Sequence, residues 1–266
     1  MIHATFCYCF KDGDFADNLK RLAGCGFEAV EIWQHDLESR PLHETAKALQ
    51  DAGLKCSQIC PYFNFVHSAD EWHESMDVGL RCIDYSRDLG NPLIRVFTGP
   101  LGQDLRVCGA DATPQQWDAA IRGLAGLCAQ AEKHGVRFCL EVHPGTLAED
   151  SHTTLKLISA VQSDSLVANP QIPLRGEDPW YSLGRLAGHI AHFHAHNWSD
   201  RLDGTATFLA AGIFDWERYL RTALRDGFDG CVSIEHASVS GQGDPWKAAE
   251  VDGAYLCQLA DKLNVP

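Results

Sequence analysis

The chain lacks the short motifs that mark several large enzyme classes. It has no glycine-rich phosphate loop followed by lysine, no Gly-x-Ser-x-Gly turn and no Cys-x-x-Cys pair. These motifs supply a phosphate cradle, a serine nucleophile and a redox dithiol, respectively. Nucleotide chemistry, serine hydrolysis and thiol redox catalysis therefore lose support. Cys7-Tyr8-Cys9 is too small a cluster for a zinc site.

Positive charge and long apolar runs are also scarce. Lys and Arg total 22 against 36 Asp and Glu, which gives a formal net charge of -14. Because nucleic-acid binding depends on clustered Lys and Arg, we expect no nucleic-acid partner. No stretch is long and apolar enough to span a bilayer, and the N-terminus has no basic segment followed by an apolar one. We therefore expect no membrane partner and a cytoplasmic location.

The eleven cysteines are scattered through strand-like and helix-like segments instead of forming a disulfide framework. Several of them fall within apolar strand-like runs, for example Cys7, Cys56, Cys139 and Cys231. This distribution favours reduced thiols in the core over disulfides.

The remaining pattern is an alternation of strand-like and helix-like runs over all 266 residues. Such alternation is typical of a parallel sheet, and eight strands are the number that closes a barrel. We therefore predict an α/β fold, a (β/α)8 TIM barrel that forms a single domain over residues 1–266. The expected strands are 3–8, 29–33, 55–60, 93–97, 136–142, 166–169, 190–194 and 231–235. The expected helices are 14–25, 42–52, 71–89, 114–134, 153–161, 180–186, 216–226 and 246–263, with left-handed glycine caps at Gly26, Gly53, Gly90, Gly135 and Gly227.

Three of these runs carry carboxylates or imidazoles near the end of an apolar stretch. They are Leu140-Glu141-Val142-His143, His192-Phe193-His194-Ala195-His196 and Ser233-Ile234-Glu235-His236. In a TIM barrel the carboxyl ends of the strands carry the chemistry, and carboxylate and imidazole groups suit a divalent metal. Glu141, Asn169, His194 and Glu235 then stand near the ends of four successive strands.

These motifs resemble those of the sugar phosphate isomerase/epimerase family, which shares the xylose isomerase-like TIM barrel. The resemblance rests on residues 140–145, 192–197 and 232–235, and extends to Ala-Val-Glu-Ile-Trp at 29–33 and Ile-Arg-Val-Phe-Thr-Gly at 94–99. It implies one divalent ion, Mn²⁺ first, with Zn²⁺, Co²⁺ and Mg²⁺ as alternatives. The implied ligands are Glu141, Asn169, His194 and Glu235.

Two positions depart from the family pattern. Asn169 stands where the family usually has Asp, so its amide oxygen would coordinate without adding charge. Ile172 stands where the family has a His that contacts substrate. Both departures weigh against the ketohexose epimerase subgroup.

The resemblance implies an isomerase or epimerase that acts on a keto-sugar or a related hydroxy-ketone. The reaction would remove the proton next to a carbonyl and proceed through an enediolate, with Glu141 and Glu235 as base and acid. The alternative is a metal-dependent lyase or dehydratase of the same barrel family, which expels a β-leaving group from a keto-sugar or a 3-keto-glycoside. A DNA-repair endonuclease, which the charge opposes, a sugar-binding barrel without turnover and a metal-free barrel with an internal polar network remain as further alternatives.

Several residues near the strand ends are candidates for substrate contact. His143 faces the same side of its strand as Glu141, and His196 lies past the end of its own strand. Arg95 either pairs with an interior carboxylate such as Glu31 or reaches the substrate, and His192 is either a buried imidazole or a functional one. We expect a small sugar as the partner and leave a homo-oligomer open. The other candidate substrate contacts are Trp33, Phe63, Asn64, Trp198 and Arg201.

Overall fold

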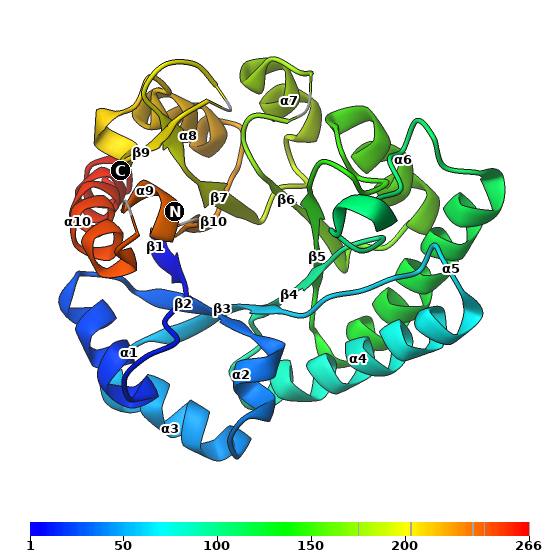
Figure 1. The fold of residues 1–266 in the computed structure, drawn as a ribbon, viewed down its shortest axis with the longest axis horizontal. Helices are drawn as coiled ribbons and strands as arrows, with labels where there is room; N and C mark the ends of the chain where they lie inside the picture. The colour runs from blue at the N-terminus through cyan, green and yellow to red at the C-terminus, as the bar shows by residue number, and fades with distance from the viewer. Residues whose placement is uncertain (175, 203, 236, 242, 266) are drawn as a thin grey trace. The chain divides into compact units, whose positions relative to one another are not determined.

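The structure, a computed structural model, describes residues 1–174, 176–202, 204–235, 237–241 and 243–265 (Figure 1). His236, the last residue of the third sequence run, lies outside this range. The chain divides into two compact units. Unit 1 contains residues 1–32, 36–57 and 191–266, and unit 2 contains residues 33–35 and 58–190.

The sheet of unit 1 contains four parallel strands in the order β2-β1-β10-β7. These are β1 (Ile2–Cys7), β2 (Ala29–Trp33), β7 (His192–Ala195) and β10 (Gly230–Ile234). The register pairs Thr5 with Ser233 and Ser233 with His194. Most of their side chains are buried, as expected for parallel strands that are covered on both faces.

Several helices of unit 1 begin at acidic caps. The carboxylate of Asp14 accepts a hydrogen bond from the Asp17 amide (3.1 Å) at the start of α1 (Phe15–Gly24), and Asp215 caps α8 (Trp216–Arg225) in the same way. Helix α3 (Leu42–Ala52) ends at Gly53, whose φ of 71° is the left-handed conformation that glycine adopts without strain. Helices α1 and α3 lie side by side (Figure 1), and α10 (Pro245–Leu263) packs against β1 and against α9 (Ala237–Ser240).

The sheet of unit 2 has the order β6-β5-β4-β3 and is also parallel. Its strands are β4 (Leu93–Val96), β5 (Phe138–Val142), β6 (Leu166–Pro170) and the second half of β3 (Lys55–Cys60). Helices α4 (Ala69–Asp88), α5 (Pro114–Ala131), α6 (Ser151–Val161) and α7 (Pro179–Leu186) pack as successive neighbours. Leu174 and Leu186 pack with Val142 of β5 in a buried apolar cluster.

The predicted elements agree with the structure to within a few residues at each end. All eight predicted strands are present, and all five predicted glycine caps have positive φ. The sequence did not predict the short elements α2 (Gln34–Glu38), α9, β8 (Asn197–Trp198) and β9 (Ala206–Thr207) or the 3-10 turns, because segments of this length carry no hydrophobic period. Within the described ranges, no helix has both the length and the apolarity to cross a membrane.

Candidate metal centre and active site

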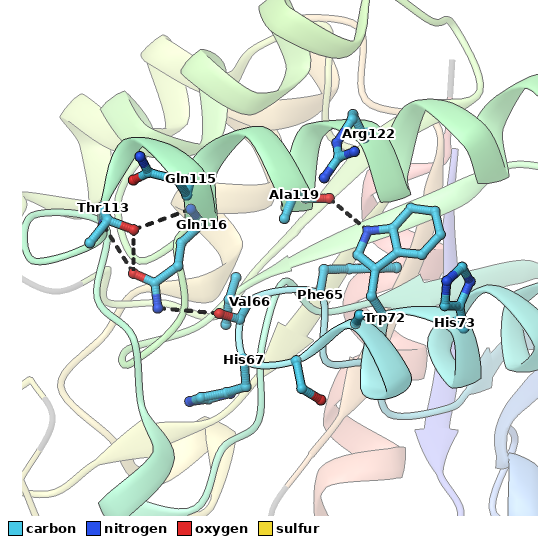
Figure 2. A pocket seen from close by; sticks show the side chains of 12 residues that line it. Phe65, Val66, His67, Trp72, His73, Thr113, Gln115, Gln116, Ala119 and Arg122 are labelled. Carbon is cyan, nitrogen blue, oxygen red and sulfur yellow. Dashed lines mark hydrogen bonds between the residues drawn. The ribbon is translucent and has the colours of Figure 1, made fainter.

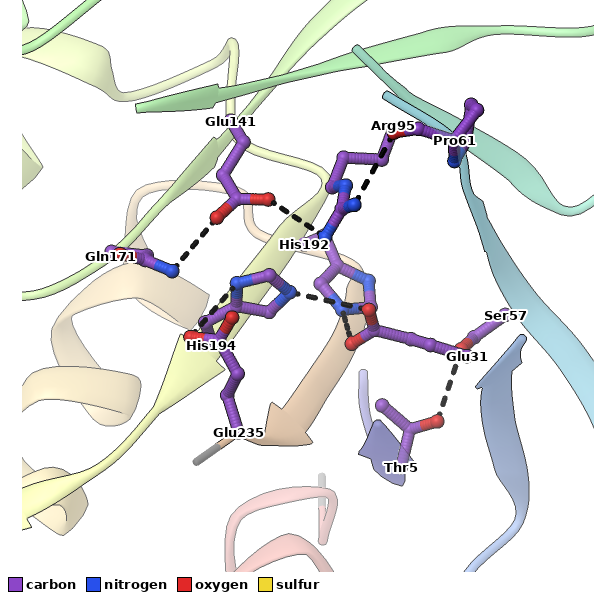
Figure 3. A network of polar contacts seen from close by, with 10 residues as sticks. All are labelled: Thr5, Glu31, Ser57, Pro61, Arg95, Glu141, Gln171, His192, His194 and Glu235. Atoms are coloured by element: carbon purple, nitrogen blue, oxygen red, sulfur yellow. Dashed lines mark hydrogen bonds and ion pairs between the residues drawn. The ribbon is translucent and has the colours of Figure 1, made fainter. Parts of the chain in front are cut away.

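A buried carboxylate with two histidines forms the centre of the polar cluster in unit 1. Glu31 lies on β2, and His192 and His194 lie on β7. All three side chains are fully buried. The Nε2 atom of His192 lies 2.9 Å from one oxygen of Glu31, and Nε2 of His194 lies 3.3 Å from the other (Figure 3). Each carboxylate oxygen therefore faces one imidazole, and the two rings lie nearly perpendicular, at 88°.

This arrangement depends on the curvature of the sheet in unit 1. Strands β2 and β7 are the outermost strands in the order β2-β1-β10-β7, yet Glu31 reaches both histidines of β7. A flat sheet would hold these strands about 14 Å apart, at roughly 4.8 Å per neighbouring pair. The sheet is therefore strongly curled, as a barrel wall requires.

The two histidines keep Glu31 ionised. Burial by itself raises the pKa of a carboxyl group because it disfavours the charged form. The charges and hydrogen bonds of His194 and His192 outweigh burial and lower the pKa of Glu31 well below its ordinary value. A carboxylate at this position therefore needs imidazole N–H donors on both of its oxygens.

Glu235 approaches His194 from the other side of the ring. It follows directly after β10, whose register pairs Ser233 with His194, and its carboxylate lies 3.4 Å from Nδ1 of His194. The side chain of Glu235 is 13 % exposed, whereas that of His194 is fully buried. Glu235 is thus the member of this cluster that solvent or a small molecule can reach.

The donor set fits a cation between His194 and Glu235. A histidine that donates its Nε2 hydrogen to a carboxylate, as His194 can to Glu31, is able to offer Nδ1 to a metal ion. The facing carboxylate oxygen also presents only lone pairs, and two acceptors at 3.4 Å repel each other unless a proton or a metal ion lies between them. Nitrogen and carboxylate donors are those that Zn²⁺, Mn²⁺ and Co²⁺ accept.

The polar cluster of unit 2 is built around a different carboxylate. Glu141 of β5 is 1 % exposed, and its oxygens lie 3.4 Å from the guanidinium of Arg95 and 2.8 Å from the amide nitrogen of Gln171, which donates to it (Figure 3). The guanidinium of Arg95 also donates to the Pro61 carbonyl at 3.3 Å. An interior carboxylate does pair with Arg95, as one of the two sequence alternatives predicted, and the observed ion pair is with Glu141.

Aromatic rings surround the guanidinium of Arg95. Its central carbon lies 4.6 Å from the ring centre of Trp33, 5.1 Å from that of Tyr62 and 4.8 Å from that of Phe97. These distances are within the range of a cation–π interaction. The rings and Glu141 together replace the water that an exposed guanidinium would bind, so they hold this cation in a dry environment.

Asn169 is the strand neighbour of Glu141. The register of β5 and β6 pairs the two residues directly, and Asn169 is fully buried. The structure therefore brings together two of the predicted ligands in unit 2, Glu141 and Asn169, and two in unit 1, His194 and Glu235.

The predicted substrate contacts have different local surroundings. The Nδ1 atom of His143 donates to the Pro144 carbonyl (2.7 Å), so its Nε2 is left as an acceptor. Phe63 is buried against Phe65 and Phe138.

Asn64 binds Glu71 through its amide nitrogen (2.8 Å). Trp198 is buried with its ring edge-on to His196, and Arg201 is exposed.

Unit 2 also contains a pocket of about 580 Å³ (Figure 2). Residues 65–69, 72 and 73, around the start of α4, and the first turns of α5 line it. Several of its polar groups bind one another: the Trp72 indole donates to the Ala119 carbonyl (2.9 Å) and the Gln116 amide donates to the Val66 carbonyl (3.2 Å). None of the described residues that line this pocket is a predicted site residue.

The cysteines are reduced, as the sequence predicted. All eleven are free thiols. Burial raises the pKa of Cys231 and of Cys128 to about 12, so both stay protonated and are poor nucleophiles at neutral pH.

Sequence reasoning missed two residues of the clusters. Glu31 was considered only as a partner for Arg95, although a charged residue within the apolar run Ala-Val-Glu-Ile-Trp signals an interior partner. Gln171, which orients Glu141, follows directly after β6, and its place beyond a strand end was the available signal.

Comparisons with known proteins agree with this architecture. The xylose isomerase-like TIM barrel family matches residues 19–255. A 3-dehydroshikimate dehydratase of Bacillus anthracis is 26% identical over 224 residues, which cover 79% of this chain and 75% of that protein.

Two solved structures show the same fold. D-psicose 3-epimerase from Clostridium cellulolyticum H10 has a TM-score of 0.80 at 14% identity and covers 99% of this chain and 100% of its own. A xylose isomerase-like TIM barrel protein from Mycobacterium smegmatis, in complex with magnesium, has a TM-score of 0.76 at 18% identity and covers 99% and 97% of the two chains.

These matches confirm the predicted (β/α)8 barrel and the family resemblance inferred from the strand-end motifs. The similar proteins include both a dehydratase and an epimerase. The chain belongs to the xylose isomerase-like TIM barrel family.

Proposed function

We propose that this protein is a divalent-metal-dependent enzyme that removes the proton next to the carbonyl of a small hydroxy-ketone. Isomerisation or epimerisation of a keto-sugar is the proposed outcome. The observation that carries the proposal is the 3.4 Å approach of the Glu235 carboxylate to Nδ1 of His194, whose Nε2 faces Glu31. This geometry creates a demand for a cation next to the one carboxylate of the cluster that is partly exposed.

We assign His194, Glu235, Glu141 and Asn169 as the ligands of this ion, with Mn²⁺ as the first choice of metal. In a TIM barrel the carboxyl ends of all strands lie at the same end, which supports Glu141 and Asn169 as the members from β5 and β6. When bound, the ion would polarise the substrate carbonyl and stabilise the negative charge that develops on its oxygen.

The two glutamates have unequal roles in this proposal. Glu141 is buried, paired with Arg95 and oriented by Gln171, so it offers a fixed carboxylate. Glu235 is partly exposed and offers the more accessible proton acceptor. Proton removal by Glu235 and proton return through Glu141, or the reverse, would give the isomerised product.

We further propose that aromatic and polar side chains near the strand ends hold the substrate. The bare Nε2 of His143 can accept a hydrogen bond from a substrate hydroxyl. Trp33 can cover the C–H face of a sugar, since aromatic rings pack well on such faces. The other proposed contacts are Arg95, Phe63, Asn64, His196, Trp198 and Arg201.

Elimination is the second candidate reaction, and the 26% identity to a 3-dehydroshikimate dehydratase favours it. The first step would be the same proton removal. The difference lies in the second step, in which a β-hydroxyl leaves instead of a proton returning. In both reactions Glu235 is thus the base that removes the first proton.

Metal content tests the proposal before any substrate is known. We expect close to one divalent ion per chain by elemental analysis, and its loss in His194→Ala. His152→Ala, which replaces an exposed histidine of α6, is the matched control and should keep the ion. A parent protein that binds no Mn²⁺, Zn²⁺, Co²⁺ or Mg²⁺ after reconstitution would contradict the proposal.

Solvent deuterium separates the two reactions in the metal-loaded protein. Keto-sugars and 3-dehydroshikimate would be incubated in D₂O and followed by NMR and mass spectrometry. Deuterium in a recovered epimer or isomer supports the isomerase, whereas a dehydrated product without an epimer supports the lyase. A panel of hydroxy-ketones that shows neither exchange nor elimination would overturn both.

A further inference from the structure

The pocket of unit 2 differs in charge from the chain as a whole. None of the described residues that line it is an Asp or a Glu, although the chain has 36 acidic residues against 22 Lys and Arg. The lining does include Arg122 of α5, His73 of α4 and His67. A cleft lined by groups of one sign attracts ligands of the opposite sign, so this pocket suits an anion better than a cation.

Aromatic side chains form the apolar part of the pocket. Phe65 is 1 % exposed, and its ring centre lies 6.4 Å from that of Trp72, with the two planes at 66°. The indole N–H of Trp72 donates to the Ala119 carbonyl at 2.9 Å, which fixes the ring between α4 and α5. An aromatic ring that is already fixed loses little conformational freedom when a ligand packs against it.

Most polar groups at one end of the pocket already have partners within the protein. Gln116 donates to the Val66 carbonyl at 3.2 Å, and its side-chain oxygen accepts from the Thr113 amide at 3.0 Å. Arg122, in contrast, takes part in none of the ion pairs and side-chain hydrogen bonds observed within the described ranges. Its guanidinium is therefore available to a ligand, and it can bind a carboxylate through two parallel hydrogen bonds.

The carboxylates next to the pocket in the sequence are directed elsewhere. Glu71 accepts hydrogen bonds from the Asn64 amide at 2.8 Å and from the Ser68 hydroxyl, so its oxygens point to the segment that precedes α4. Asp118 adjoins Ala119 on α5, and successive helix residues point about 100° apart. Neither acid therefore occupies the pocket in place of a ligand.

The arrangement of the groups defines the shape of a suitable ligand. Figure 2 shows Arg122, Trp72 and His73 at one end of the pocket and Thr113 and Gln116 at the other. The free guanidinium thus lies beside the fixed indole ring. The volume of about 580 Å³ is within the range of small-molecule sites.

We propose that this pocket is a second ligand site, which takes a small organic anion with a flat apolar body, of the aromatic carboxylate class. The carboxylate pairs with Arg122, and the rings pack against Trp72 and Phe65. The proposal is independent of the proposed metal-dependent function, because none of the described lining residues is a predicted metal ligand or substrate contact.

The first experiment follows Trp72 by ¹⁹F NMR in metal-free protein labelled with 5-fluorotryptophan. The chain has seven tryptophans, and Trp72→Phe identifies the signal of Trp72. The probe is 2-naphthoate, which we expect to shift this signal in a saturable way. The neutral 2-naphthalenemethanol and acetate, which lack the charge and the rings respectively, should bind at least several-fold more weakly. A Trp72 signal that does not respond to 2-naphthoate, or equal affinity for the neutral compound, would overturn the proposal.

The second experiment removes the charge of the pocket. Arg122→Gln should bind 2-naphthoate roughly tenfold more weakly, which is the lower end of what a hydrogen bond to a charged group contributes. Arg87→Gln is the matched control, since Arg87 lies in the last turn of α4, is exposed and pairs with Asp84 at 3.4 Å. It should bind like the parent protein. Parental affinity in Arg122→Gln would refute the role of the guanidinium.

Glu235→Gln tests whether the ligand binds at the candidate metal centre instead. Glu235 belongs to unit 1 and does not line the pocket, so this variant should retain parental affinity for 2-naphthoate. Loss of binding in Glu235→Gln would contradict the second site. Because these titrations use metal-free protein, a protein that never binds metal would refute the proposed function alone, and a metal-binding protein whose Trp72 ignores 2-naphthoate would refute the second site alone.

Discussion

The polar clusters of the two units stabilise a buried carboxylate with different partners. Each contains a buried glutamate, Glu31 in unit 1 and Glu141 in unit 2. Glu31 faces two imidazoles, whereas Glu141 faces a guanidinium, which carries a permanent positive charge, and an amide. Imidazole nitrogens can also bind metal ions, whereas a guanidinium has no lone pair to offer, so the two clusters differ in the ligands that they can provide.

This difference decides what each cluster can do. Around Glu141 the charge is balanced by Arg95, and three aromatic rings cover that guanidinium. Around His194 the partners are carboxylates instead, since Nδ1 lies 3.4 Å from Glu235 and Nε2 lies 3.3 Å from Glu31. In the function that we propose, the unit 2 cluster supplies a carboxylate with a fixed charge partner, and the unit 1 cluster supplies the accessible proton acceptor.

The largest expected effect comes from removing the accessible carboxylate of unit 1. Glu235→Gln keeps the size of the side chain but can no longer accept a proton, so turnover should fall by on the order of a thousandfold. The measurement is the rate of solvent-deuterium exchange into the substrate by the metal-loaded enzyme. Far-ultraviolet circular dichroism should be unchanged.

Glu217→Gln is the matched control for this change. Glu217 lies on the surface of α8, where it binds Lys262 and Arg221, and it should be dispensable for turnover. Substantial activity in Glu235→Gln would show that another group carries the proton.

The second largest expected effect is on stability, and it tests the buried ion pair of Arg95 and Glu141. Arg95→Leu leaves a buried carboxylate without its positive partner, which should lower the free energy of unfolding by about 3–5 kcal/mol. Adding Glu141→Leu removes the uncompensated charge and should restore part of this loss. Chemical denaturation of both variants measures the difference.

The surface pair of Arg221 and Glu217, at 3.0 Å, provides the control. Arg221→Leu should change stability little, since water screens an exposed ion pair. If Arg95→Leu were equally mild, the aromatic rings would not form a dry environment for this charge.

Most of the fold could be predicted from the sequence because local signals specify it. Period-two apolar runs indicated the eight strands, and glycines such as Gly53 and Gly227 indicated the helix ends. The helix α2 and the hairpin β8–β9 had no such signal, since two to five residues are too few to show a period.

The candidate site could be predicted in its residue types but not in its pairings. The strand-end positions indicated His194 and Glu235, which the structure brings together. The partner of Arg95 could not be deduced, because two buried glutamates were available and the choice depends on sheet curvature, which individual strand sequences do not encode. The same curvature brings Glu31 to β7.

A third buried carboxylate extends the comparison, and it has neither an imidazole nor a guanidinium among its observed contacts. Asp252 of α10 is 1 % exposed and accepts a hydrogen bond from the Leu209 amide at 2.6 Å. Burial raises its pKa from the ordinary 3.8 to about 6, against the opposing effect of that hydrogen bond. Glu31 and Asp252 are thus shifted in opposite directions, since imidazole donors favour the charged form of Glu31 and burial disfavours that of Asp252.

The raised pKa of Asp252 should make the stability of the protein depend on pH. Between about pH 4 and pH 6 the folded state binds more protons than the unfolded state, so the free energy of unfolding should fall as the pH rises through this window. Asp252→Asn resembles the protonated acid and retains an oxygen for the Leu209 amide. The variant should therefore match the parent near pH 4 and exceed it by on the order of 2 kcal/mol above pH 7. Urea denaturation at a series of pH values measures this difference, and a gap between variant and parent that does not grow with pH would show that Asp252 titrates normally.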